Sequence, residues 1–129
     1  MANQFVVQLK NEPGAMATLA EALAARGVDL RAIGGGGIGD SGHVIMTTAD
    51  DDTTKQILDE GGYTYIEGES ILAEVDDRPG GMAALSRQLA DAGVNIYGHL
   101  FLGRWGDRAM FAFVVDDPDK ARPILERKG

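Results

Sequence analysis

Two short turns carry the residue types best suited to binding chemistry in this sequence. They read Asn11-Glu12-Pro13-Gly14-Ala15-Met16 and Asp77-Arg78-Pro79-Gly80-Gly81-Met82. Proline presets a helical φ and the following glycine permits φ above zero, so each turn is expected to lead from a strand into a helix. The next two amides, of Ala15 and Met16 or of Gly81 and Met82, would then be free at the positive end of the helix dipole, where carboxylates bind.

The residue that opens each turn, Asn11 or Asp77, would lie beside this carboxylate site and could hold an ammonium group. A carboxylate site next to an amine site describes an α-amino acid. The same residues could instead serve only as a helix cap and a tight turn. A single turn does not decide between these two roles.

The two turns belong to an internal repeat. When Pro13 is placed over Pro79, the stretch PGAMATLAEALAARGVDL lies over PGGMAALSRQLADAGVNI, and Pro, Gly, Met, Ala, Leu, Leu, Ala, Gly and Val coincide. The flanking segments agree in pattern, FVVQLKN with ILAEVDD and HVIMTTADD with AMFAFVVDD. Long ungapped self-similarity of this kind indicates two fused modules rather than one domain. We place them at residues 1–68 and 69–129.

Each module is expected to contain the same elements in the same order. A strand (5–10, 70–75) precedes a helix whose apolar residues recur at three- and four-residue spacing. Gly27 and Gly93 end these helices as left-handed C′ residues. Two strands joined by a glycine-containing turn follow (28–36 with 43–49, 94–102 with 109–115). Asp117 caps a second helix that has Pro118 at its first position, and Asp51 occupies the matching place in the first module.

These elements predict an α+β fold of two ferredoxin-like βαββαβ modules, each an antiparallel sheet with helices on one face. A last strand over 63–66 completes the first module. The second module has no evident counterpart, because its final helix, expected over 119–127, runs almost to Gly129. Three explanations for this missing strand remain open: truncation, a strand supplied by a neighbour, or an open sheet edge.

The order strand, Asn/Asp-x-Pro-Gly, helix, Gly-Val-Asp/Asn-Leu/Ile, strand resembles the ACT domain, a regulatory module of amino-acid biosynthetic enzymes. The resemblance covers nearly the whole chain twice, and it implies a ligand site between paired modules, lined by the loop after the first strand and by the start of the second strand. It also implies that the chain is not an enzyme, because the catalytic domain that usually accompanies the module is missing. The implied ligand-binding residues are Asn11, Pro13, Gly14, Ala15, Met16, Val28, Asp29 and Leu30, and in the second copy Asp77, Pro79, Gly80, Gly81, Met82, Val94, Asn95 and Ile96.

The two copies differ in charge at these positions. Asn11 matches the anionic Asp77, whereas Asp29 matches the neutral Asn95. Each copy therefore keeps one carboxylate but carries it at a different place in the site. We expect one dominant site, or two sites with different ligands.

Composition excludes several other functions. The net charge of −8 is spread over both halves, and no basic face is available for nucleic acid. The chain has no cysteine, no apolar run long enough to span a membrane, and no signal sequence, so we expect a cytoplasmic protein without disulfides. No serine, threonine or lysine stands beside a histidine in matching context, so a catalytic triad is not supported.

Three further patterns are weaker. Residues 34–39 read GGGGIG and formally satisfy G-x-G-x-x-G, but a strand follows them instead of the helix that a dinucleotide site needs; these glycines could leave room for a ligand or a partner strand, or only pair poorly. His43 and His99 do not correspond between the copies, and the acidic run 50–52 lacks the other residues of a calcium loop, so we expect neither a metal nor a cofactor. Trp105, at a hairpin tip, could mark a partner surface or fold back on its own hairpin.

The leading hypothesis is a module that binds a free amino acid and regulates an enzyme. The alternative is a protein-interaction or assembly domain that uses the same interface without a ligand. We also expect at least a homodimer, because a module of this size is marginally stable alone and unpaired strand edges seek partners.

Overall fold

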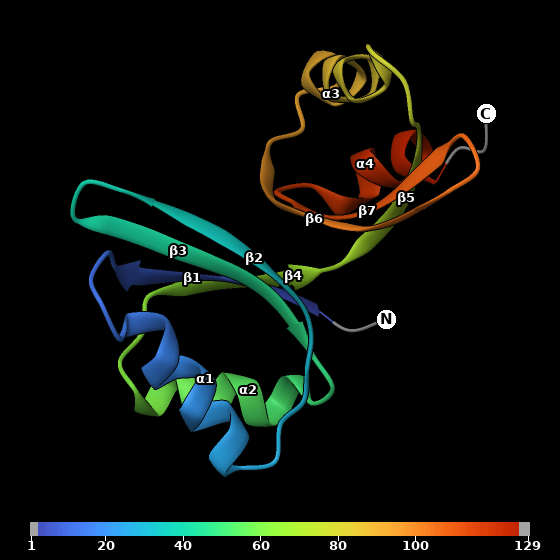
Figure 1. Cartoon of the computed structure of the whole chain (residues 1–129). Helices are drawn as coiled ribbons and strands as arrows, with labels where there is room; N and C mark the ends of the chain where they lie inside the picture. Colours follow the sequence, from blue (N-terminus) through green and yellow to red (C-terminus); the bar gives the residue numbers. More distant parts are fainter. Residues whose placement is uncertain (1–2, 127–129) are drawn as a thin grey trace. The chain divides into compact units, whose positions relative to one another are not determined.

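The computed structural model describes residues 3–126, and the chain divides into two compact units between Gly68 and Glu69. Each unit is a twisted sheet with two helices on one of its faces (Figure 1).

The first module has the order βαββαβ. Its sheet has the strand order β2-β3-β1-β4, with β3 antiparallel to both β1 and β2. The prediction of an α+β, ferredoxin-like module is confirmed. The elements are β1 (Asn3–Lys10), α1 (Ala15–Ala25), β2 (Leu30–Ile38), β3 (Ser41–Thr48), α2 (Asp51–Glu60) and β4 (Tyr65–Glu69).

The second module has the order βαββα. Its three strands lie in the order β5-β7-β6, all antiparallel, and no fourth strand follows within residues 3–126. The absence of a last strand from this module is therefore as predicted, although Arg127, in the expected final helix, lies outside the described residues. The elements are β5 (Ile71–Asp76), α3 (Gly81–Asp91), β6 (Ile96–Trp105), β7 (Arg108–Val115) and α4 (Pro118–Leu125).

The helix ends follow the local sequence with one exception. Gly27 and Gly93 follow α1 and α3 with φ of 70° and 78°, as predicted for left-handed C′ residues. The cap of α2, however, is Asp50 rather than Asp51: Asp50 is extended and accepts a hydrogen bond from the Thr53 amide. Asp51 is the first helical residue, and its carboxylate accepts a hydrogen bond from the Asn3 amide in β1. The first module lacks the proline that fixes the helix start in the second.

Each module has its own apolar core between sheet and helices. Phe5, Leu19 and Leu23 are fully buried in the first core, and Leu89 and Phe113 are almost fully buried in the second. Met16, which the helical spacing assigned to the core face, is instead 36% exposed at the start of α1. The strand predicted over 63–66 is shifted to Tyr65–Glu69, because Gly61 and Gly62 extend the connection after α2.

Candidate functional site

The Pro-Gly turn has the same geometry in both modules. Gly14 and Gly80 have φ of 89° and 90°, and each follows a proline, which is the pattern of a type II turn. The turn is closed by a hydrogen bond from the Ala15 amide to the Glu12 carbonyl (3.3 Å) in the first module. The Gly81 amide donates to the Arg78 carbonyl (3.1 Å) in the second.

This geometry corrects one expectation about the carboxylate site. The amides of Ala15 and Gly81 are used inside the turn, so they are not free for a ligand. The amides of Met16 and Ala17 have no hydrogen-bond partner among the described residues. The free donors at the start of the helix therefore begin one residue later than the sequence suggested.

Asn11 and Asp77 have different partners. The Asn11 side chain donates from Nδ2 to the Gly39 carbonyl (2.9 Å), and its own amide donates to the Asp40 carbonyl (3.0 Å). Its Oδ1 has no partner within the described residues and can still accept a hydrogen bond. The Asp77 carboxylate instead pairs with Nε of Arg104 at 2.8 Å. A ligand ammonium at Asp77 would have to share this carboxylate with a cation that is already present.

Within a single module, the predicted residues of the second strand do not meet the turn. Val28 and Val94 are buried in the two cores, and Leu30 and Ile96 pack against them. Val28 follows the far end of α1, whose 11 residues span about 16 Å. Asp29 forms an exposed ion pair with Arg31, and the Asn95 amide donates to the Asp116 carboxylate. That the turn and the second strand bind one ligand together remains a prediction.

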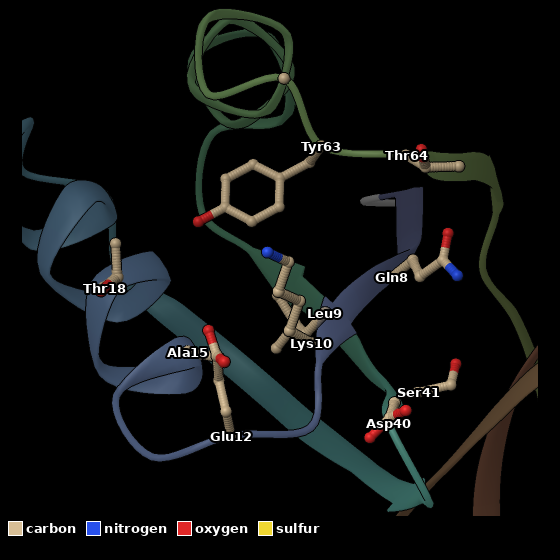
Figure 2. Close-up of a pocket in the computed structure, with 11 residues that line it drawn as sticks. Gln8, Leu9, Lys10, Glu12, Ala15, Thr18, Asp40, Ser41, Tyr63 and Thr64 are labelled. Atoms are coloured by element: carbon tan, nitrogen blue, oxygen red, sulfur yellow. The ribbon is translucent and has the colours of Figure 1, made fainter.

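Two cavities flank the start of α1 in the first module. The larger, which we call the β4-side cavity, has a volume of about 540 Å³ and lies between β1, α1 and the connection from α2 to β4 (Figure 2). This volume is within the range of small-molecule sites. It is lined by Gln8, Leu9, Lys10, Glu12, Ala15, Thr18, Asp40, Ser41, Gly62, Tyr63 and Thr64.

The smaller β2-side cavity, about 360 Å³, lies on the other flank and is lined by Asn11, Met16, Ile33 and the glycines 34–36, among others. Strand β2 runs close to its neighbours here: a Cβ on Gly35 would lie 2.3 Å from the His43 carbonyl oxygen. A Cβ on Gly37 would lie 2.6 Å from the Asn11 side chain. The glycine run therefore lets β2 pack closely against β3 and leaves room for the Asn11 side chain.

The second module has one cavity at the corresponding position. It is lined by Glu74, Val75, Asp76, Gly81, Ala84, Leu85, Gln88, Arg108 and Ile124, and its volume is about 170 Å³. A Cβ on Gly81 would lie 2.1 Å from the Asp76 carbonyl oxygen, so α3 starts very close to β5. This close approach accounts in part for the smaller space.

Two tyrosines near the β4-side cavity differ in their hydrogen bonding. The Tyr65 hydroxyl donates to the Asp59 carboxylate at 2.6 Å, and this hydrogen bond raises the pKa of Tyr65 to about 12. The Tyr63 hydroxyl has no hydrogen-bond partner in the described part of the chain. It is available to a ligand in the cavity that it lines.

Sequence comparison identifies the first module. Residues 4–60 match the ACT domain family. The first module is an ACT domain. The match covers the elements from β1 to α2, including the Pro-Gly turn. It contains every residue that lines the β2-side cavity, and all those that line the β4-side cavity except Gly62, Tyr63 and Thr64. No curated protein matches the chain significantly in sequence.

Solved structures extend the similarity of fold over both modules. Protein BT0572 from Bacteroides thetaiotaomicron aligns with a TM-score of 0.72 at 21% identity, over 97% of this chain and 86% of that one. The ligand-free regulatory subunit of aspartate kinase from Thermus thermophilus aligns with a TM-score of 0.62 at 20% identity, over 97% and 87% of the two chains. The corresponding subunit from Thermus flavus gives 0.64 at 18%, over 98% and 92%. At these identities the likeness shows a common fold.

The described residues show neither a metal site nor a membrane-spanning helix. Within residues 3–126, no group of three or more His, Cys, Asp or Glu side chains is placed to hold a metal ion. None of the described helices is long and apolar enough to cross a membrane.

The sequence-based prediction overlooked several residues near the turn. Arg104 and Arg108 pair with acidic residues of the second module, and Tyr63 and Lys10 line the β4-side cavity of the first. Lys10 stands over Asp76 in the repeat, so this charge reversal was visible in the sequence. Tyr63 follows α2 and is far from the turn in sequence, so nothing local connected the two.

Proposed function

We propose that this chain is a non-enzymatic regulatory protein that binds a free amino acid. The observation that carries the proposal is the ACT-domain match over the module in which two open cavities flank the Pro-Gly turn. Its fold is similar to proteins described as regulatory subunits of aspartate kinase, which supports a regulatory role exerted on a separate enzyme.

The proposed binding surface is the turn before the first helix of each module. The free amides of Met16 and Ala17 at the positive end of α1 favour a ligand carboxylate. The predicted residues stay part of the proposal in both copies: Asn11, Pro13, Gly14, Ala15, Met16, Val28, Asp29 and Leu30 in the first, and Asp77, Pro79, Gly80, Gly81, Met82, Val94, Asn95 and Ile96 in the second. We also propose that the protein works as a homodimer.

A second candidate function is assembly with another protein. Phe101, Leu102 and Trp105 on β6 are between 41% and 54% exposed, which is unusual for large apolar side chains that lie so close together in sequence. The Trp105 ring also packs over Gly103, where an added Cβ would lie 2.9 Å from it. Both roles considered for this tryptophan, partner contact and packing on its own hairpin, therefore remain compatible with its position.

A thermal-shift screen with each proteinogenic amino acid at millimolar concentration separates the two functions. A ligand at one hundred times its dissociation constant stabilises the folded state by about 2.7 kcal/mol, which raises the melting temperature by several degrees. The ligand-induced shift in melting temperature is then measured for Asn11→Ala and for Asp77→Ala and compared with the shift of the wild type. If no amino acid moves the wild-type melting temperature, the assembly function takes the place of the sensor.

A further inference from the structure

The β4-side cavity of the first module and the cavity described above in the second module occupy the same place in the repeat. Gln8, Leu9 and Lys10 of β1 match Glu74, Val75 and Asp76 of β5, and Ala15 matches Gly81. Their volumes nevertheless differ, at about 540 and 170 Å³. The repeat therefore contains one open and one narrowed version of the same cavity.

The charged residues of the open cavity have no partners of their own. Lys10, Glu12 and Asp40 line it, and none of their side chains forms an ion pair or hydrogen bond with another described residue. Figure 2 shows Lys10 reaching toward the Tyr63 ring and Glu12 near the start of α1, whereas Asp40 lies apart from them beside Ser41. A cation and an anion that line one cavity are the charges needed to bind a zwitterion.

In the smaller cavity the one cation that lines it, Arg108, is already paired with acids. Arg108 pairs with Asp76, to which it is opposite in the β5–β7 register, and lies 3.7 Å from the Glu74 carboxylate. In the first module the residue opposite Lys10 is Ser41, which leaves the lysine ammonium without an acid. One cross-strand pair thus distinguishes a larger cavity with an unpaired lysine from a smaller cavity whose arginine is paired with acids.

The Tyr63 ring is held in place by the chain around it. A Cβ on Gly61 would lie 2.7 Å from this ring, so glycine is required where the ring packs. The ring also contacts the first core, while its hydroxyl has no partner within residues 3–126. A rigid aromatic with a free hydroxyl can recognise a ligand at little entropic cost.

We propose that only the first module binds the amino acid, and that it does so in the β4-side cavity. Lys10 binds the ligand carboxylate, Glu12 binds the ammonium group, and the Tyr63 hydroxyl donates or accepts a hydrogen bond. This inference rests on the proposed function and adds to it the copy, the cavity and the recognising residues. It moves the carboxylate partner from the Met16 and Ala17 amides to Lys10, and the ammonium partner from Asn11, which lines the β2-side cavity, to Glu12; it also restricts binding to the first copy.

The decisive variant copies the second module into the first, as Lys10→Asp together with Ser41→Arg in the full chain. The amino acid that shifts the wild type in the screen is titrated by calorimetry. We expect one ligand per chain for the wild type and loss of detectable binding for this double variant. Lys10→Met should weaken binding by more than about tenfold, and Tyr63→Phe by about two- to tenfold.

The matched control is the reverse exchange, Asp76→Lys together with Arg108→Ser, which should leave the affinity unchanged. Circular dichroism checks each fold, and if the double variant of the first module is unfolded, Lys10→Met and Tyr63→Phe decide. Wild-type affinity in both Lys10 variants, two ligands per chain, or loss of binding in the control overturns the inference while the sensor function stands. If no amino acid binds the wild type, both proposals fail.

Discussion

At the scale of single residues, the Pro-Gly turn needs glycine for its backbone conformation and not for lack of space around it. Gly14 has φ of 89° in open space, because no atom lies within 4 Å of the position that its Cβ would occupy. A substitution there is therefore penalised by the backbone conformation and not by a collision.

The residue-scale prediction compares Gly14→Val with Gly14→Asn. Asparagine tolerates positive φ at this turn position, whereas a β-branched residue does not. We expect Gly14→Val to reduce the free energy of unfolding by about 1–3 kcal/mol and Gly14→Asn to reduce it clearly less. Urea denaturation measures both. Equal losses in the two variants would show that something other than backbone strain sets the cost.

At the scale of elements, the start of α2 depends on Asp50. Its carboxylate accepts hydrogen bonds from the Thr53 hydroxyl and amide, and these lower the pKa of Asp50 below its usual value of 3.8. Hydrogen bonds to the charged form favour that form in the folded protein. A carboxyl with a lowered folded pKa stabilises the fold above its unfolded pKa, and this contribution is lost as the pH falls through the folded value.

Protonation of Asp50 at low pH should therefore weaken the cap of α2. Asp50→Asn keeps a capping acceptor but does not titrate, so its stability relative to the wild type should improve as the pH falls below about 3.8. At pH 7 the Asp50→Ala variant should melt at a lower temperature than Asp50→Asn. Melting curves from pH 7 to about pH 2.5 test both statements. The cap assignment fails if Asp51→Ala, used as the comparison, has the larger effect at pH 7.

At the scale of the whole molecule, the two modules have separate cores. Leu23 of α1 and Leu89 of α3 occupy matching positions in the repeat and are 0% and 1% exposed, each in its own apolar cluster. A core that touches only its own module should transmit a local loss of packing mainly within that module. This supports treating 1–68 and 69–129 as two domains.

The prediction at this scale uses the matched pair Leu23→Ala and Leu89→Ala. Each should cost about 2–5 kcal/mol, because each removes a fully buried side chain and leaves a cavity. Amide hydrogen exchange on the full chain should show faster exchange in the first module for Leu23→Ala and in the second for Leu89→Ala. Equal acceleration in both modules from either change would mean that the chain unfolds as one cooperative unit.

The sequence by itself determined the repeat, the order of the elements and the left-handed glycines that end the helices. These features depend on local patterns: the apolar period of each helix, the Pro-Gly turns, and Gly27 and Gly93 with positive φ. Local patterns are read directly from neighbouring residues, so the α+β, βαββαβ plan and the strand missing from the second module could be predicted. The cap of α2 could not, because three consecutive aspartates, residues 50–52, offer the same acceptor one residue apart.

Only the tertiary structure decided which residues share a cavity. Tyr63 and Lys10 come from segments far apart in sequence, and they meet because β4 pairs with β1 at the edge of the sheet. The register that places Ser41 opposite Lys10 and Arg108 opposite Asp76 is likewise a property of the sheet. Sequence periodicity fixes which face a side chain occupies, but long-range strand pairing fixes its neighbours. The difference between the two cavities was therefore hidden in a repeat whose turns are nearly the same.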